Sequence, residues 1–238
     1  MTTPGQSSGT TTFTLSNSAI VTEAFDRIGV RLAQLDRHHL VSARVSLNLE
    51  LQSWSNRGIN LWKMTSGTIS LVAGTATYTL PTSLVTLTEM WFTTVDMTGG
   101  ANSTDRFMVP ITREEYAMIP TKTETGSPMQ YWFQRLLVPQ VTMWQPPAEG
   151  APNYVVNWFG LSRIGDAGIS GGETPDIVYR GLDALCAGLA KRLASKFAPQ
   201  RLQEKAAEFT EAWNLFAMND QETGPTIIVP NVAGYWRI

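Results

Sequence analysis

The spacing of apolar residues changes twice along this 238-residue chain, and these changes constrain the fold more than any other feature. In residues 16–66 and 174–222, apolar side chains recur every three or four positions, which is the period of one helix face. In residues 67–173 they alternate with a period of two, as in strands with one buried face. The pattern predicts an α+β fold: a four-helix core with an antiparallel β insertion between helices 2 and 3.

Within the insertion, runs rich in β-branched and aromatic residues are divided by Gly and Pro, which predicts an antiparallel meander. The expected strands cover residues 68–72, 75–80, 85–95, 107–109, 131–134, 136–138, 141–144 and 154–159. Thr112 and Glu115 have the spacing of a capping box, so a short helix is expected there. We interpret residues 163–173, which are rich in Gly, as a linker back to the helices, because their acidic residues lack the spacing of a calcium loop.

Polar residues and glycines mark the expected ends of the helices. Ser16 to Ser18, Asp36 and Thr174 are candidate N-caps of the first three helices, and Pro199 begins the fourth. Gly29 ends the first helix, because glycine takes the left-handed C′ conformation without a steric clash.

The second helix ends within the stretch from Leu47 to Trp62. Its core stripe is Leu40, Ala43, Leu47, Leu51 and Trp54, widened by Val41, Val45 and Leu49. More polar faces are left for Ser42, Arg44, Ser46, Asn48 and Glu50. With Gly58 at C′, Trp54 at C3 would contact Ile59 at C″. We therefore predict a capped core helix whose core and cap residues are Leu47, Leu51, Trp54, Gly58 and Ile59.

The segments Ala24–Gly29 and Leu47–Trp62 resemble the head-to-tail adaptors of short-tailed phages, the ring proteins that extend the portal after DNA packaging. The resemblance implies a virion protein at the head–tail junction, made in the host cytoplasm. It implies a homo-oligomeric ring of twelve copies that docks on the portal protein and continues the DNA channel. It further implies an attachment surface for the tail nozzle and for tail fibres or spikes.

The two ends of the chain have distinct compositions. Residues 1–15 are rich in Thr, Ser and Gly and carry no charged side chain, so we expect a flexible N-terminal arm that orders against a neighbour. Residues 223–238 contain Gly224-Pro225 and cannot continue the fourth helix. We predict that this extended tail docks on the portal; the alternative is that it folds back on its own subunit. The docking residues would be Ile227, Ile228, Val229, Tyr235, Trp236, Arg237 and Ile238.

Composition argues against several functions. The net charge of −2 is unlike that of a protein that grips DNA through a basic face, although DNA could slide past such a wall without tight binding. The one cysteine, Cys186, sits among apolar residues and is interpreted as a core thiol. The pair His38-His39 points in two directions on a helix and is not expected to chelate a metal. No run of about 20 apolar residues predicts a membrane span.

No catalytic motif is present: the sequence has no nucleophile elbow, Walker loop or dinucleotide fingerprint. We therefore expect a structural protein without enzyme activity, cofactor or metal. The rival hypothesis is a carbohydrate-binding or depolymerising tail protein, in which aromatic side chains on the β region stack on sugars. Its candidate platforms are Trp91, Trp132, Trp144 and Trp158, which we prefer to interpret as core or inter-subunit anchors.

Overall fold

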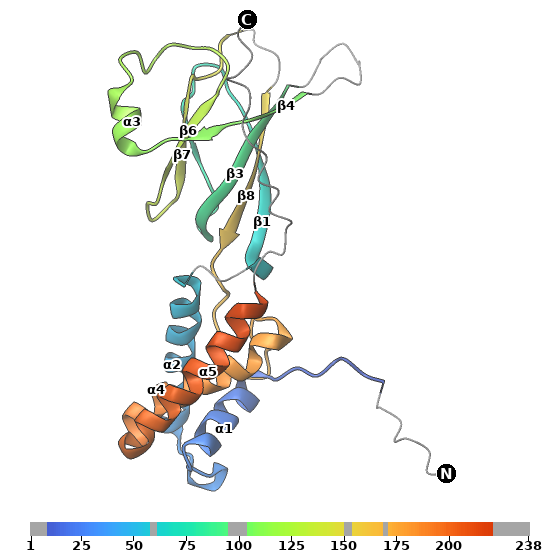
Figure 1. Cartoon of the computed structure of the whole chain (residues 1–238), viewed down its shortest axis with the longest axis vertical. Helices are drawn as coiled ribbons and strands as arrows, with labels where there is room; N and C mark the ends of the chain where they lie inside the picture. The colour runs from blue at the N-terminus through green and yellow to red at the C-terminus, as the bar shows by residue number, and fades with distance from the viewer. Residues whose placement is uncertain (1–8, 58–60, 95–103, 150–153, 169–170, 221–238) are drawn as a thin grey trace, which may run out of the picture.

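The structure is a computed structural model that describes residues 9–57, 61–94, 104–149, 154–168 and 171–220. It is elongated, with long helices at one end and two β-sheets at the other (Figure 1). We call these ends the helical part and the β part. The expected α+β class is confirmed. The predicted cap residues Gly58 and Ile59 and the predicted tail, residues 223–238, lie outside the described residues.

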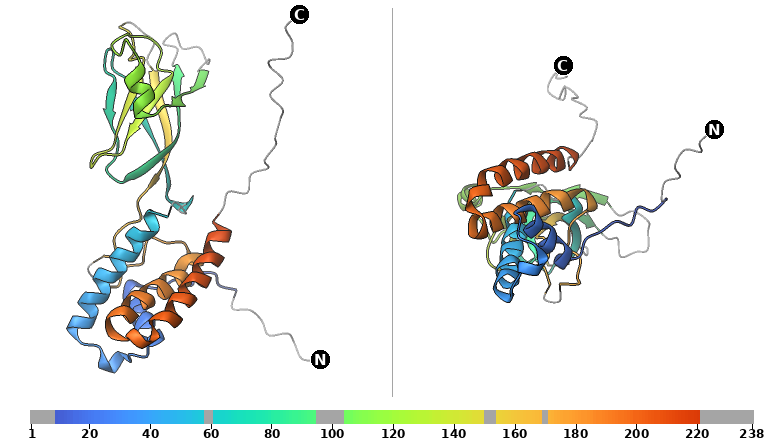
Figure 2. Two further views of the ribbon diagram at one scale, coloured as in Figure 1. Left: turned by 60° about the vertical axis from the view of Figure 1, so that its left-hand side comes forward. Right: turned by 90° about the horizontal axis from the view of Figure 1, so that it is seen from below.

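The helical part contains α1 (Asn17–Arg27), α2 (Arg37–Ser55), α4 (Leu182–Phe197) and α5 (Leu202–Asn219). Short 3-10 turns precede or connect them at η1 (Leu32–Gln34), η2 (Leu61–Lys63), η3 (Tyr179–Gly181) and η4 (Pro199–Arg201). Helix α4 is the central element, with α1 and α2 on one side and α5 on the other (Figure 2). These helices share one hydrophobic core, in which α4 is buried along most of its length.

Local sequence signals place the ends of α1 correctly. The Ser16 hydroxyl accepts a hydrogen bond from the Ala19 amide at 3.3 Å and caps the first turn. Gly29 has φ 82°, and the Val30 amide donates to the Phe25 carbonyl at 3.0 Å. This is the predicted C-terminal motif, in which glycine reverses the chain and satisfies the last carbonyls.

Helix α2 begins at its predicted cap but buries a narrower face than predicted. Ala43, Leu47, Leu51 and Trp54 are buried against α1, α4 and α5. The expected extension of this stripe is wrong, because Val41, Val45 and Leu49 are half exposed. Leu40, predicted to belong to the stripe itself, is half exposed as well. Two residues expected on polar faces, Ser46 and Glu50, are buried instead. The reason is that α2 lies at the edge of the helical part, so one flank of the helix meets no other element (Figure 2).

The predicted start of the third long helix is also wrong. That helix is α4, and it begins at Leu182, not after Thr174. Asp176 instead ties the intervening segment to the link between the two parts: its carboxylate accepts from Lys63 Nζ at 2.5 Å and from the Gly165 amide at 2.9 Å. These contacts hold the chain in a non-helical path, so local N-cap chemistry does not decide where the helix begins.

The β part has two four-stranded sheets around a second core. In strand order, one sheet is β1 (Met64–Ser70), β8 (Tyr154–Ser162), β3 (Leu84–Thr94) and β4 (Thr104–Phe107). The other is β2 (Thr77–Thr79), β7 (Gln140–Trp144), β6 (Gln130–Gln134) and β5 (Val109–Pro110), flanked by α3 (Arg113–Met118). Thr112 and Glu115 form the predicted capping box of α3.

The predicted meander is wrong. Strand β1 pairs with β8, which lies at the other end of the β part in sequence, and the short β5–β6 pair is parallel. The expected strand at residues 136–138 is a bend between β6 and β7, with its apolar side chains exposed. Closing two sheets over a shared core requires long-range pairing, which sequence proximity does not reveal.

Candidate assembly surfaces

The interior of the described residues shows few groups suited to chemistry. Within the described ranges, no group of three or more His, Cys, Asp or Glu residues could hold a metal ion. None of the described helices has the length and hydropathy needed to cross a bilayer. Cys186 is buried in the helical core, and burial raises the pKa of its thiol to about 11, so it is a poor nucleophile at neutral pH. The features that invite a functional explanation are therefore on the surface.

The first surface is the outer face of α2. Val41, Val45 and Leu49 follow one another at intervals of four residues and are 57%, 53% and 50% exposed. Arg37 and Arg44, both exposed, lie on the same helix. The only acidic residue between Arg37 and Ser55 is Glu50, which is buried. We call this basic and apolar surface the α2 face.

The second surface is the outer face of α5. Leu215 and Met218, near the end of the helix, are 60% and 71% exposed. A shallow hollow of about 510 Å³ lies along this side, lined by Ala207, Thr210, Glu211, Asn214, Leu215 and Met218. Glu204 and Glu211 are exposed on the same helix, whose one basic residue, Lys205, is buried. We call this acidic and apolar surface the α5 face.

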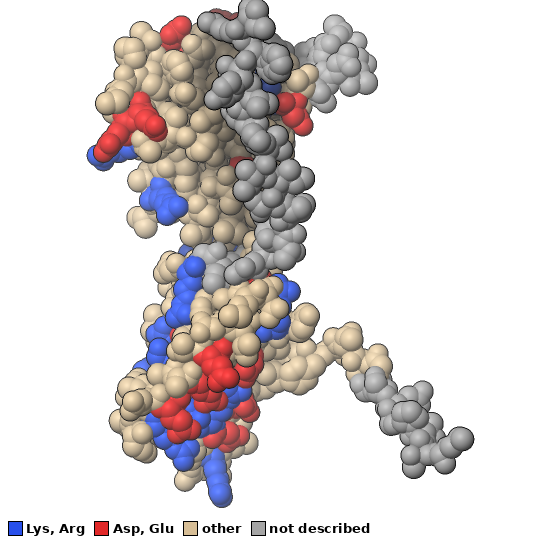
Figure 3. Space-filling view, viewed as in Figure 1, with Lys and Arg blue, Asp and Glu red and all other residues tan. Residues whose placement is uncertain are grey.

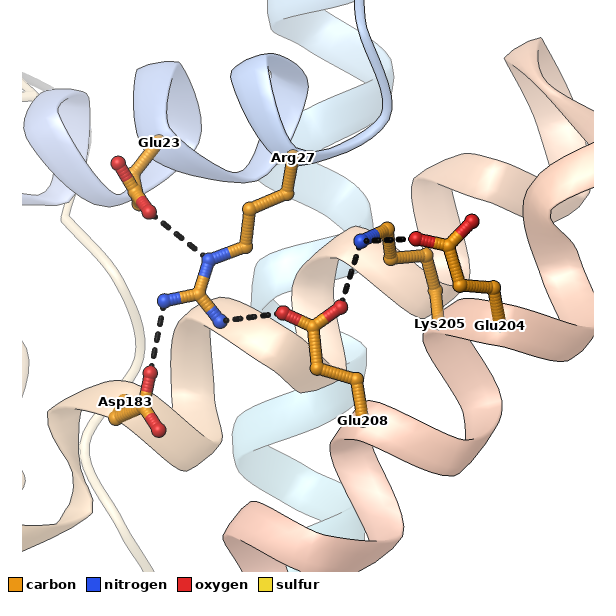
Figure 4. A network of polar contacts seen from close by, with 6 residues as sticks. All are labelled: Glu23, Arg27, Asp183, Glu204, Lys205 and Glu208. Carbon is orange, nitrogen blue, oxygen red and sulfur yellow. Dashed lines mark hydrogen bonds and ion pairs between the residues drawn. The ribbon is translucent and has the colours of Figure 1, made fainter.

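A polar network holds α1, α4 and α5 together behind the α5 face (Figure 4). Arg27 donates to Glu23 at 2.9 Å and to Asp183 at 2.8 Å, and it lies 3.4 Å from Glu208. Burial opposes the charge on Arg27, but the hydrogen bonds to Asp183 and Glu23 outweigh it and raise the pKa of the guanidinium. Glu208 also binds Lys205 at 2.7 Å, so one carboxylate links two cations. This network gives α5 a fixed position on the core.

A second buried charge pair holds α2 to α4. The Glu50 carboxylate accepts from Trp54 Nε1 at 2.9 Å and from Arg192 Nε. Trp54 is itself fully buried, and its ring stacks on Phe216 of α5 with 5.4 Å between centroids. The polar and aromatic contacts together position α2 against α4 and α5.

The β part carries few charges on the side seen in Figure 3, whereas Lys, Arg, Asp and Glu side chains gather on the helical part. Its exposed apolar residues include Leu136, Leu137 and Val138 at the β6–β7 bend, and Phe107, Val109, Met118 and Met129 around β4, β5 and α3. The Val109 amide donates to the Met129 carbonyl at 2.9 Å, so these two residues are neighbours. The β part thus offers its own apolar contact sites.

The tryptophans of the β part are not exposed platforms. Trp158 is buried in the sheet core, and the other three rings are half-buried. Trp91 packs on Phe159 at 5.0 Å, Trp132 stacks on Tyr116 at 5.3 Å, and Trp144 donates from Nε1 to the Thr121 carbonyl. The carbohydrate-binding hypothesis therefore lacks the exposed rings on which it depends.

The combination of a helical part with apolar outer faces and a sparsely charged β part fits a structural assembly protein. The family model described as SU10 adaptor protein matches residues 22–229, and the chain belongs to that family. A comparison with curated proteins gave no match. The resemblance to the head-to-tail adaptors of phages is confirmed, and the chain is a structural phage adaptor protein.

The structure also locates surface residues that the sequence analysis assigned to the core. Val41, Val45 and Leu49 lie on the α2 face, although their apolar character and helical spacing favoured burial. A signal was present, because Arg44 lies three residues after Val41 and so shares its side of the helix, and an arginine is rarely buried. The predicted core residues Leu47, Leu51 and Trp54 are buried, on the other side of the helix.

Proposed function

We propose that this adaptor forms a ring of twelve copies that docks on the portal, continues the DNA channel and provides the attachment surface for the tail nozzle and for fibres or spikes. We interpret the helical part as a four-helix core, the β part as its insertion between the second and third of those helices, and the head–tail junction as its place in the virion. Membership of the adaptor family supports the proposal.

The observation that carries the ring is the position of the exposed apolar residues. Helices α2 and α5 lie on opposite flanks of the helical part (Figure 2), and Leu49 on α2 and Leu215 on α5 are both at least half exposed. A monomeric protein rarely keeps apolar strips uncovered on two opposite sides. A ring covers both at once, because each subunit in a heterologous assembly offers a different face to each neighbour.

The portal is the proposed partner of the C-terminal segment. Ile227, Ile228 and Val229 are β-branched or apolar, and Tyr235, Trp236 and Ile238 form a second apolar group, with Arg237 between them in sequence. An extended apolar segment of this kind suits addition to a strand edge or insertion into a groove. Deleting residues 231–238 should weaken portal binding about tenfold while leaving the melting temperature nearly unchanged.

The β part is proposed to face the tail. Its exposed apolar residues, such as Leu137 at the β6–β7 bend, are candidates for contact with tail components. Because the surface carries few charges on the side seen in Figure 3, contact there would rely mainly on apolar burial.

The decisive experiment mixes the purified protein with the portal protein of the same phage. Electron microscopy and mass measurement should show a ring of twelve adaptors on one end of the portal. The adaptor alone is expected to be a monomer or a small oligomer, since a ring that closed in isolation would compete with ordered assembly. Failure to bind the portal over a range of micromolar concentrations would exclude the proposed function.

A further inference from the structure

We propose that neighbouring subunits of the ring meet through the α2 face of one copy and the α5 face of the next. The proposal rests on the ring assembly proposed above and names the surfaces that would form its seam. The occupant of each face is thus a second copy of this chain. Three observations support the pairing: charge, spacing and direction.

The two faces carry opposite charges. The exposed charged residues of α2 are Arg37 and Arg44, and within the described residues neither has an ion-pair partner. The α5 face exposes Glu204 and Glu211. Glu204 forms an ion pair with Lys205, which also binds Glu208, so two carboxylates share one cation there. An α2 face would therefore repel another α2 face, and the same holds for two α5 faces. Only the heterologous pairing brings the arginines to the glutamates.

The charges are spaced alike on the two helices. Arg37 and Arg44 are seven residues apart, as are Glu204 and Glu211. Seven residues are about two turns, or roughly 10.5 Å along a helix axis. In one register of the two helices, Arg37 lies opposite Glu204 and Arg44 opposite Glu211. If one helix is shifted by two turns, Arg44 still lies opposite Glu204. Apolar residues accompany the charges on each face: Val41, Val45 and Leu49 on α2, and Ala207, Leu215 and Met218 on α5.

The two helices run in the same direction within a subunit. Both end next to the β part: the Leu61 amide, just beyond α2, donates to the Asp220 carboxylate, just beyond α5, at 3.2 Å. Rotation about a ring axis along the length of the molecule preserves this direction. In the seam α2 and α5 would therefore be parallel, with the arginines and Glu204 toward the ends far from the β part.

Charge reversal tests the seam without depending on the register. The α2 variant is Arg37→Glu with Arg44→Glu, and the α5 variant is Glu204→Arg with Glu211→Arg. Each variant alone should load onto the portal about tenfold more weakly than the wild type, because every seam then opposes like charges. Mixing the two variants in equal amounts should restore rings, because each seam of an alternating ring again joins opposite charges. The matched control, Arg113→Glu on α3 in the β part, should assemble like the wild type.

A cross-linking measurement gives a second readout that does not depend on electrostatics. Leu49→Cys is combined either with Leu215→Cys or with Ala207→Cys, which correspond to the two registers; Cys186 is buried and does not interfere. On the portal, one of the two combinations should give a ladder of disulfide-linked oligomers under oxidation, and Leu49→Cys alone should not.

The outcomes separate the seam from the function. The seam is overturned if the wild type and the charge-reversed variants load equally well on the portal and neither cysteine pair gives a ladder. That outcome leaves the adaptor function intact. A wild-type protein that does not load overturns the proposed function itself. If a charge-reversed variant loses helical content, the cysteine pairs test the seam in its place, because they substitute exposed residues.

Discussion

Glu50 is a charged side chain in the interior, and its counter-ion comes from another helix. Its carboxylate satisfies both Trp54 Nε1 and Arg192. A buried ion pair is costly to desolvate, but breaking it by removing one partner leaves an uncompensated charge. The pair therefore specifies how α2 lies on α4 more than it adds to the free energy of unfolding.

Arg192→Met should lower the free energy of unfolding by about 3 kcal/mol, because it strands the Glu50 carboxylate. Adding Glu50→Gln should recover most of that loss, since the neutral amide needs no counter-ion and its oxygen still accepts from Trp54. Urea denaturation measures both effects. Arg163→Met, at an exposed arginine, is the control and should stay within about 0.5 kcal/mol of the wild type. A double variant as unstable as the single one would contradict the explanation.

At the scale of the helix, Gly188 allows α4 to lie between α2 and α5. A Cβ at this position would come within 2.7 Å of Glu50 Oε1 and 2.9 Å of Phe209 Cε2. The absence of a side chain thus brings three helices together at one level of the core. Helix propensity alone would favour alanine there, so close packing overrides the local preference.

Gly188→Ala should destabilise the protein by about 1–3 kcal/mol, because the added methyl group overpacks the contact between the helices. The comparison is Gly172→Ala, at an exposed glycine where an added Cβ meets nothing within 4 Å. Thermal and urea unfolding of the two variants should differ clearly. If the two substitutions have the same effect on stability, the helices at Gly188 can accommodate a methyl group and the overpacking explanation is wrong.

The N-terminus of α2 responds to pH. The hydrogen bond that the Asp36 carboxylate accepts from the His39 amide holds the pKa of this carboxyl below its ordinary value of 3.8, and desolvation opposes this shift without reversing it. Because the folded-state pKa is depressed, the stabilisation by the cap is present above pH 3.8 and is lost as the pH falls through the folded-state value. Asp36→Asn should therefore melt below the wild type at pH 7, and the gap should close in acid. A gap that does not change with pH would exclude the charge as its source.

At the scale of the whole molecule, charge is distributed unevenly. The net charge is −2, and the charged side chains on the side seen in Figure 3 concentrate on the helical part, where acidic and basic residues intermingle. No broad basic surface is visible on that side. A channel wall of this kind would let DNA pass, because tight phosphate binding would slow its movement.

Gel-shift titration with duplex DNA at physiological salt should therefore give no discrete complex at submicromolar protein. The assay is best done with both the free adaptor and the adaptor mixed with the portal, since the proposed channel would form only in the assembly. The portal alone serves as the background. Tight binding that appears only when the adaptor is present would contradict the expectation.

Features that depend on residues a few positions apart follow directly from the amino-acid sequence. Ser16, Gly29, Asp36 and Thr112 mark helix ends where they were predicted, because capping hydrogen bonds and a left-handed glycine are local interactions. The change of apolar period predicted the α+β class for the same reason. The spacing of apolar residues matches the geometric period of a helix or a strand, so it predicts which of the two forms.

The burial of side chains and the pairing of strands depend on the tertiary structure. Val45 is exposed and the adjacent Ser46 is buried, because α4 packs on only one side of α2. β1 joins β8, about ninety residues away, because both belong to one sheet that closes over the second core. Asp176 keeps the chain after Thr174 out of a helix through contacts with Lys63 and Gly165. These outcomes depend on neighbours that are distant in sequence, and for that reason periodicity and local propensity could not predict them.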